Sequence, residues 1–384
     1  MSVTAARGFR AAGVAAGLKP SGRPDVALVV NDGPGAAAAG VFTRNRVQAA
    51  PVLWSLEVCR AGELRAVVLN SGGANACTGP AGFADTHRTA EHTAGLLDVG
   101  AGEVAVCSTG LIGERLPMGK LLDGVSKAVA GLSPTAGGDA AEAIRTTDSV
   151  PKQARRTTEQ GWTVGGMTKG AGMLAPSLAT MLAVLTTDAV ADAESLRAVL
   201  TRAAAETFER VDSDGCLSTN DTVLLLASGA SGVAPEPAEL QAAVTEVCAD
   251  LARQLIADAE GASKEIAVQV CNAATESDAV DVGRAVARSN LLKCALHGED
   301  PNWGRVLAAV GTTGAAYDPM SLDVAINGVW VCQGCAPGEP RGAVDLTGRQ
   351  VQITIDLHAG SAAATVWTND LTAAYVHENS AYST

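Results

Sequence analysis

The sequence has few aromatic residues, few histidines and no excess of basic residues. Phe, Trp and Tyr make up 3% of the 384 residues, whereas hydrophobic residues make up 47%. A large core is therefore available, and it must be packed mainly by valine, leucine and alanine. The formal net charge of -13 argues against a nucleic-acid or anionic-membrane partner, because a surface of that sign repels phosphates.

Long apolar segments are also missing. No run approaches the ~20 apolar residues of a membrane helix. The first 17 residues carry Arg7 and Arg10 among alanines and glycines, where a signal peptide would need an apolar stretch. We therefore expect a cytoplasmic protein without a membrane partner.

Several common catalytic motifs do not occur. The sequence has no Gly-x-Ser-x-Gly elbow, Walker A motif or Gly-x-Gly-x-x-Gly motif after a strand. The five histidines lack metal-ligand spacing and an obvious Ser or Cys partner, which argues against a metal site and a histidine-based triad. The nine cysteines are expected to be reduced thiols, mostly in the core. Cys332 and Cys335 form the one CxxC motif, which favours a hairpin turn over zinc binding. We expect neither a metal nor a cofactor.

The apolar pattern predicts alternating strands and helices. Strands are expected at 26–31, 38–42, 65–70, 103–107, 222–227 and 265–271, and helices at 84–97, 192–208 and 239–257. After Asn302 a short helix precedes four further strand-like segments. We predict an α/β to α+β fold, a layered sandwich of stacked sheets flanked by helices (αββα-like). A smaller C-terminal α+β domain is expected at 281–384.

The segment from Lys169 to Asp188 has an unusual composition. Glycines and Pro176 lead to Thr180, and the apolar run from Met181 to Leu185 reads as a buried strand. A threonine freed at its backbone nitrogen could use its own α-amino group as a base and would need no histidine. The local pattern alone favours the simpler interpretation, an ordinary loop that enters a core strand.

Three further positions could contribute to an acyl-transfer site. Ser108-Thr109-Gly110 follows a predicted strand and could supply a hydroxyl and a main-chain N–H to an oxyanion, or could be a polar strand end. Lys169 could bind a substrate carboxylate or be solvated. Glu260, after a long helix, could hold an ammonium group.

Motifs along essentially the whole chain resemble those of the ornithine acetyltransferase family (glutamate N-acetyltransferase), whose members are self-cleaving, N-terminal-nucleophile-type enzymes of arginine biosynthesis. The resemblance rests on Gly8–Gly13, Gly40–Val47, Asn70–Gly79, Ser108–Gly113, Thr146–Ser149, Lys169–Leu182, Ser218–Thr222, Glu260–Lys264, Asp300–Arg305 and Asn379–Thr384.

The resemblance implies cleavage between Ala179 and Thr180, which gives an α chain (1–179) and a β chain (180–384) in an α2β2 assembly. Residues 180–280 would complete the main domain. Thr180 would be the nucleophile, and Thr109 with Gly110 would form the oxyanion hole. The residues implied to contact the amino-acid substrate are Thr146, Lys169, Thr180, Glu260, Asn379 and Thr384.

The implied reaction moves acetyl from N2-acetyl-L-ornithine to L-glutamate through an acetyl-Thr180 enzyme. Three alternatives stay open: a self-cleaving aminopeptidase or amidase, an acetyltransferase of a secondary-metabolite pathway, and an uncleaved amino-acid-binding protein. Whether acetyl-CoA also serves as a donor stays open too.

Overall fold

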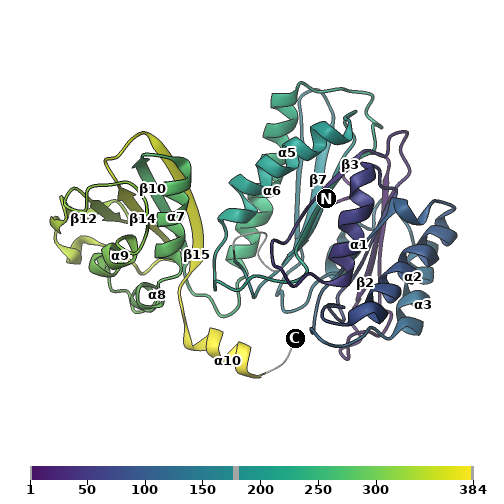
Figure 1. Cartoon of the computed structure of the whole chain (residues 1–384), viewed down its shortest axis with the longest axis horizontal. Coiled ribbons are helices and arrows are strands. Elements are labelled where there is room, and N and C mark those ends of the chain that lie inside the picture. The colour runs from purple at the N-terminus through teal and green to yellow at the C-terminus, as the bar shows by residue number, and fades with distance from the viewer. Residues whose placement is uncertain (1, 176–180, 382–384) are drawn as a thin grey trace.

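The computed structural model describes residues 2–175 and 181–381, which form three β-sheets with helices packed against them (Figure 1). The predicted mixed α/β class is confirmed at this level. In the described residues no helix has the length and apolar character needed to cross a bilayer.

The first sheet has four strands in the order β1-β2-β4-β5. The strands are β1 (Phe9–Val14), β2 (Val26–Asn31), β4 (Ala66–Asn70) and β5 (Val104–Ser108). β4 and β5 run parallel, with Asn70 beside Ser108. β2, β4 and β5 are buried at every position, as expected for strands covered on both faces.

The second sheet has five strands in the order β3-β9-β8-β7-β6. The strands are β3 (Ala38–Phe42), β6 (Lys152–Thr157), β7 (Thr163–Lys169), β8 (Leu182–Thr187) and β9 (Thr222–Ala227). β7 and β8 are antiparallel, with Lys169 opposite Leu182. β8 and β9 are parallel, with Leu182 opposite Thr222.

These two sheets pack face to face. One apolar cluster contains Val29 and Leu69 of the first sheet together with Val184 and Leu224 of the second. The outer face of the first sheet packs against α2 (Gly79–Leu97) and α3 (Met118–Ala130). The outer face of the second packs against α5 (Ala193–Glu206) and α6 (Pro237–Ala257). Two shorter helices, α1 (Ala50–Val58) and α4 (Gly137–Ala143), contact the first sheet.

The third sheet has six strands in the order β13-β12-β11-β14-β10-β15. The strands are β10 (Glu265–Ala273), β11 (Asp323–Ile326), β12 (Val329–Gln333), β13 (Ala336–Pro337), β14 (Gln350–Asp356) and β15 (Ala362–Asn369). Burial alternates along β14, so one face carries the core. That core includes residues of α7 (Glu276–Ala287), α8 (Asn290–His297) and α9 (Trp303–Val310).

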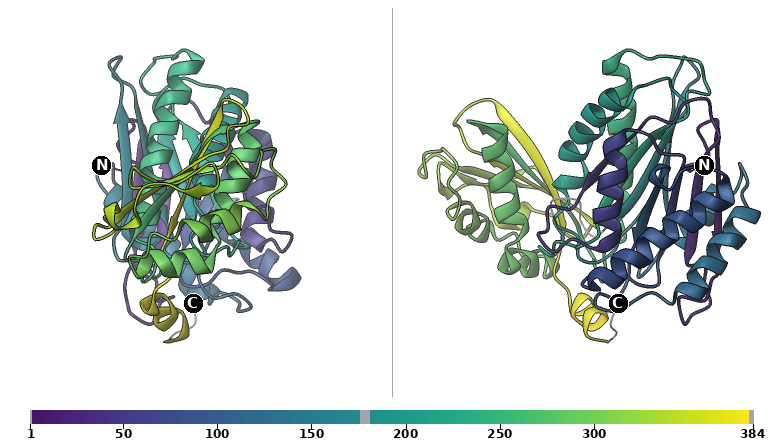
Figure 2. Two further views of the ribbon diagram at one scale, coloured as in Figure 1. Left: turned by 90° about the vertical axis from the view of Figure 1, so that its left-hand side faces the viewer. Right: turned by 45° about the vertical axis from the view of Figure 1, so that its right-hand side comes forward.

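The last helix, α10 (Ala373–Ala381), leads back from β15 toward the first two sheets (Figures 1 and 2).

Two predictions about the cysteines can be compared with this fold. Cys332 and Cys335 do lie at a hairpin between β12 and β13, and all nine cysteines are free. Only four cysteines are buried, so the expectation that most fill the core is wrong.

Candidate active site

The loop between β7 and β8 is the centre of the candidate site. Lys169 ends β7 and its register partner Leu182 begins β8, and between them the structure describes residues 170–175 and Met181. Leu174 and Ala175 in this connection are buried. The predicted cleavage bond between Ala179 and Thr180 lies outside the described residues, as does the predicted substrate contact Thr384.

The second part of the site is the loop after β5. Thr109 N–H donates to Asn70 O at 3.0 Å, and Gly73 N–H donates to Thr109 O at 3.0 Å. Gly110 has φ +127°, and a Cβ there would lie 2.8 Å from Gly73 N, so only glycine fits. Within the described chain the Gly110 N–H donates to no group. The predicted oxyanion donors are therefore the Thr109 hydroxyl and the Gly110 amide.

Two asparagines hold this loop in place. Asn70 Nδ2 donates to Gly73 O at 3.0 Å, and Asn220 Nδ2 donates to Ala74 O at 2.7 Å and to Ser108 O at 2.8 Å. All of these groups are buried, so the hydrogen bonds satisfy polar atoms that would otherwise be costly to bury. The loops at the carboxyl ends of the parallel strands β4 and β5 are thus fixed to each other and to the start of β9.

Lys169 contacts the oxyanion loop directly. Its Nζ lies 3.4 Å from Thr109 Oγ1, and the residue is 3% exposed. Burial lowers the pKa of Lys169, and the nearby carboxylates of Asp148 and Glu260 oppose that shift. The structure therefore brings Lys169 and Thr109, two of the predicted site residues, into contact in a buried environment where a charge acts strongly.

Thr146 joins this group through Asp148. The Thr146 N–H donates to Asp148 Oδ2 at 3.0 Å, and the Gly170 N–H donates to Asp148 Oδ1 at 2.6 Å. Burial raises the pKa of Asp148, but the charges of Lys169 and Lys152 outweigh burial and hold it at about 2. Asp148 is therefore a buried carboxylate between two predicted substrate residues.

Glu260 and Asn379 lie on the other side of the segment that follows Lys169, where Glu260 bonds to Ala171. The Glu260 N–H donates to Ala171 O at 2.9 Å, and a Cβ on Gly172 would lie 2.6 Å from Glu260 Oε2. Asn379 Nδ2 of α10 donates to Glu260 Oε2 at 3.0 Å. The glycine at 172 thus leaves room for the Glu260 carboxylate beside the β7–β8 connection.

Asp221 is a site residue that the sequence analysis did not identify. Its Oδ1 accepts a hydrogen bond from Met181 N–H at 3.1 Å, and its Oδ2 has no partner among the described residues. Burial raises the pKa of Asp221 well above its usual range. Asp221 directly precedes β9 and Met181 directly precedes β8, and the two residues lie side by side because these strands are parallel. The sequence would have located Asp221 only if the pairing of the two strands were known.

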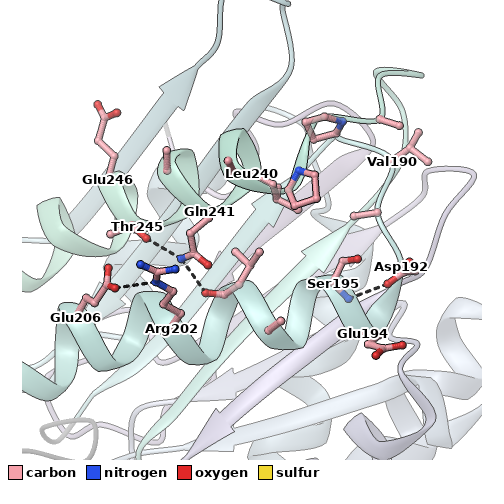
Figure 3. Close-up of a pocket in the computed structure, with 18 residues that line it drawn as sticks. Val190, Asp192, Glu194, Ser195, Arg202, Glu206, Leu240, Gln241, Thr245 and Glu246 are labelled. Carbon is pink, nitrogen blue, oxygen red and sulfur yellow. Dashed lines mark hydrogen bonds and ion pairs between the residues drawn. The ribbon is translucent and has the colours of Figure 1, made fainter.

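A broad groove lies elsewhere, between α5 and α6 (Figure 3). It has a volume of about 1430 Å³, and no candidate site residue lines it. Several of its polar side chains bond to one another: Gln241 Nε2 donates to Thr245 Oγ1 at 2.9 Å, and Arg202 pairs with Glu206 at 2.9 Å.

Comparisons with known proteins place the chain in one family. The ArgJ family model matches residues 10–384. The arginine biosynthesis bifunctional protein ArgJ of Streptomyces avermitilis is 67% identical over 383 residues, covering 100% of both chains. The protein of the same name from Mycobacterium tuberculosis is 60% identical, covering 99% of this chain and 96% of the relative.

A solved chain of ornithine acetyltransferase complexed with ornithine, from Mycobacterium tuberculosis, is 63% identical and covers 47% of this chain and 96% of its own length, with a TM-score of 0.45. The family model matches residues 10–384, and the Streptomyces avermitilis relative is 67% identical over the whole chain. The chain therefore belongs to the ArgJ family.

Proposed function

We propose that the chain is a glutamate N-acetyltransferase that moves acetyl from N2-acetyl-L-ornithine to L-glutamate. The observation that carries this proposal is the contact between the buried Lys169 side chain and the Thr109 hydroxyl, beside a Gly110 amide that donates to no group among the described residues. A cation for a substrate carboxylate and two donors for an oxyanion then lie at the end of the strand that leads to Thr180. The names of the full-length relatives support the same activity.

We propose that the enzyme first cleaves itself. Thr180 Oγ attacks the carbonyl carbon of Ala179, and the Ala179 acyl group shifts from the Thr180 nitrogen to its oxygen. Water then hydrolyses this ester, which leaves a carboxylate on Ala179 and a free α-amino group on Thr180. The products are the α chain 1–179 and the β chain 180–384, in an α2β2 assembly.

Acetyl transfer follows in two steps. Thr180 Oγ attacks the acetyl carbonyl of acetylornithine, its proton passes to the α-amino group, and ornithine leaves with that proton on its amine. The glutamate amine then attacks the acetyl ester, its proton passes through the α-amino group to Thr180 Oγ, and the bond from Thr180 Oγ to the acetyl carbon breaks to give acetylglutamate. An α-amino pKa of about 7.7 to 8.0 suits a base and acid that works near neutral pH.

Each remaining predicted residue has a place in this scheme. Thr109 and Gly110 stabilise the oxyanion in both steps, and Lys169 with Thr146 binds the α-carboxylate that both amino acids share. Glu260, Asn379 and Thr384 contact the rest of the amino acid, and the Glu260 carboxylate is suited to an ammonium group. The relatives are called bifunctional, which supports acetyl-CoA as a second donor to glutamate.

The finer architecture belongs to the same proposal. We take α2 and α3, the two stacked sheets, and α5 and α6 as the four layers of an αββα sandwich, since the sheets share a core and each carries helices on its outer face. The third sheet and its helices form the smaller C-terminal domain. β10 belongs to that sheet and begins at Glu265, upstream of the start expected at 281. A cytoplasmic location completes the proposal.

Intact mass and N-terminal sequencing of the purified protein test the cleavage. We expect two chains, the second beginning at Thr180, and a single uncut chain for Thr180→Ala. Thr180→Ser, which keeps a hydroxyl, should still cut. A second chain that begins elsewhere would contradict the assignment of the nucleophile.

A coupled assay tests the transfer. Acetylornithine plus glutamate should yield acetylglutamate faster than acetylornithine alone yields acetate. The reverse order would indicate the aminopeptidase or amidase, and an uncut protein that binds ornithine without turnover would indicate the binding protein.

A further inference from the structure

Three charged side chains, Asp148, Lys152 and Asp258, form a line of ion pairs next to the candidate site. Lys152, the first residue of β6, has a fully buried side chain whose Nζ lies 2.7 Å from Asp148 Oδ1 and 2.5 Å from Asp258 Oδ2. The Asp148 side chain is also fully buried, and the Asp258 side chain is 11% exposed. Two carboxylates therefore share one ammonium group in the protein interior.

This line connects three separate segments that carry predicted substrate residues. Asp148 accepts the N–H groups of Thr146 and Gly170, and Gly170 directly follows Lys169. Asp258 caps the C-terminus of α6, two residues before Glu260. Lys152 thus joins the segment of Thr146 and Lys169 to the segment of Glu260 through two ion pairs.

The bonds around Asp258 strengthen that connection. Its Oδ2 accepts the Ser149 N–H at 3.0 Å, and its Oδ1 accepts the Ser149 hydroxyl. Ser149 follows Asp148 in the chain, so the α6 terminus is bonded to the same short segment twice. A shift of α6 would therefore move Asp148, and with it the amide groups that Asp148 holds.

Asp148 also supplies charge to Lys169. Among the described residues, Asp148, Lys152, Glu260 and Lys19 are charged groups that act on Lys169, and the Asp221 carboxyl faces it as well. Asp148 is the strongest of the carboxylates that favour the ammonium form of Lys169. Removing its charge should make the buried ammonium harder to maintain.

We propose that Asp148 and Lys152 are positioning residues, which set the spacing of Thr146, Lys169 and Glu260 and so shape the site for the substrate carboxylate. This inference rests on the proposed function. Because both amino acids present the same carboxylate, a change in the line should weaken both substrates together. The group that takes the acetyl is not part of the line, so kcat should change less than KM.

The test compares wild type with Asp148→Asn and with the triple variant Asp148→Asn, Lys152→Met, Asp258→Asn. The triple variant removes all three charges of the line at similar volume, so neither Lys152 nor Asp258 is left without its partner. Cleavage is read by intact mass, KM and kcat are measured for acetylornithine and for glutamate, and ornithine and glutamate binding is measured by calorimetry. Arg202→Met, which breaks an exposed ion pair on α5, is the matched control.

We expect both variants to raise KM and Kd for both amino acids about tenfold or more, to lower kcat less than threefold, and to move the alkaline limb of kcat/KM to lower pH. The single variant Lys152→Arg, which keeps the charge, should raise KM and Kd less than either of these variants does. Unchanged KM and Kd for both amino acids, or an equal fall of kcat at every pH, overturns the inference. A wild type that neither transfers acetyl nor binds ornithine overturns the proposed function and this inference with it.

Discussion

At the scale of single residues, the Thr109 hydroxyl is the group with the clearest dual role. Its Oγ1 accepts a hydrogen bond from Lys169 Nζ at 3.4 Å, and in the proposed reaction its O–H donates to the oxyanion. Its main-chain N–H is already bonded to Asn70 O, so the side chain and the Gly110 amide are the two donors left for catalysis. The residue is 4% exposed, which strengthens any hydrogen bond that it makes to a charged oxygen.

Thr109→Val should therefore lower kcat about 10²- to 10³-fold, the usual cost of losing one oxyanion donor. Steady-state kinetics with both substrates measure the effect, and the melting temperature checks that the fold is kept. Thr109→Ser, which keeps the hydroxyl, should lose far less. Equal losses in the two variants would contradict a specific role of the hydroxyl, because Thr109→Ser retains it.

Asp221 should give the protein an unusual dependence on pH. Burial raises the pKa of its carboxyl, so the folded state holds a proton that the unfolded state releases above a pKa of about 3.9. Stability is therefore lost as pH rises from that value toward the folded pKa.

Asp221→Asn keeps an acceptor for the Met181 N–H and removes the titration. We expect its melting temperature to rise relative to wild type as pH increases from 5 to 8. Asp221→Ala loses the acceptor and should cost about 1–3 kcal/mol. Melting curves at several pH values measure both; an Asn variant that falls relative to wild type with rising pH would contradict the protonated state.

At the scale of elements, β7 depends on two adjacent glycines. A Cβ on Gly165 would lie 2.2 Å from Ser2 O, and a Cβ on Gly166 would lie 2.7 Å from Leu185 Cδ2. The N-terminal segment and the neighbouring strand therefore approach β7 as closely as its backbone allows. Lys169 stands at the end of this strand, so the same packing fixes the start of the candidate site.

Gly165→Ala should destabilise the protein by about 1–3 kcal/mol, because the contact is with backbone that cannot rotate away. Gly102→Ala is the control, since a Cβ there meets nothing within 4 Å, and it should change stability by no more than about 0.5 kcal/mol. Thermal unfolding of the two variants provides the comparison. Equal melting temperatures would show that the Ser2 segment moves freely.

The same glycines explain what the sequence could and could not predict about the elements. The apolar runs at 26–31, 38–42 and 222–227 match β2, β3 and β9 residue for residue. The sequence does not predict β6, which is rich in charged residues, or β7, which contains adjacent glycines. β7 is held as a strand by pairing with β8, and β6 by pairing with β7. The turn after β2 also leads into the other sheet, where β3 pairs with β9.

At the scale of the whole molecule, α10 connects the third sheet to the candidate site. It follows β15, yet Asn379 bonds to Glu260, which lies between α6 and β10. Thr372 strengthens the attachment, because its hydroxyl donates to Gly261 O at 2.7 Å. A Cβ on Gly261 would lie 2.3 Å from Tyr375 N, so the helix start sits directly on this turn.

Asn379→Ala should raise KM for both amino acids about tenfold, because the Glu260 carboxylate loses a hydrogen bond that orients it. Stability should be unchanged, since Asn379 is exposed. His377→Ala, on the same helix, is the control for general effects on α10. Kinetics and melting curves of the two variants test the role, and an equal rise of KM in both would assign the effect to the helix as a whole.

The candidate site was only partly predictable. Thr109 and Gly110 follow β5 and Lys169 ends β7, and Thr109 and Lys169 are in contact. Asp148 and Asp221 were missed, because their roles depend on bonds to Gly170 and Met181 that follow from strand pairing and not from local sequence. Whole-chain motifs could identify the family, but they could not show which of their polar residues support the others.

The strand order of the second sheet has a consequence for the proposed cut. β3, β7 and β6 precede residue 180, whereas β8 and β9 follow it, so β8 and β9 lie edge to edge between β3 and β7. The two fragments would share backbone ladders along two seams. Each half made alone would expose unpaired strand edges, which promote aggregation. The precursor must therefore fold before it is cut, and two cleaved molecules that are mixed should not exchange their halves without unfolding.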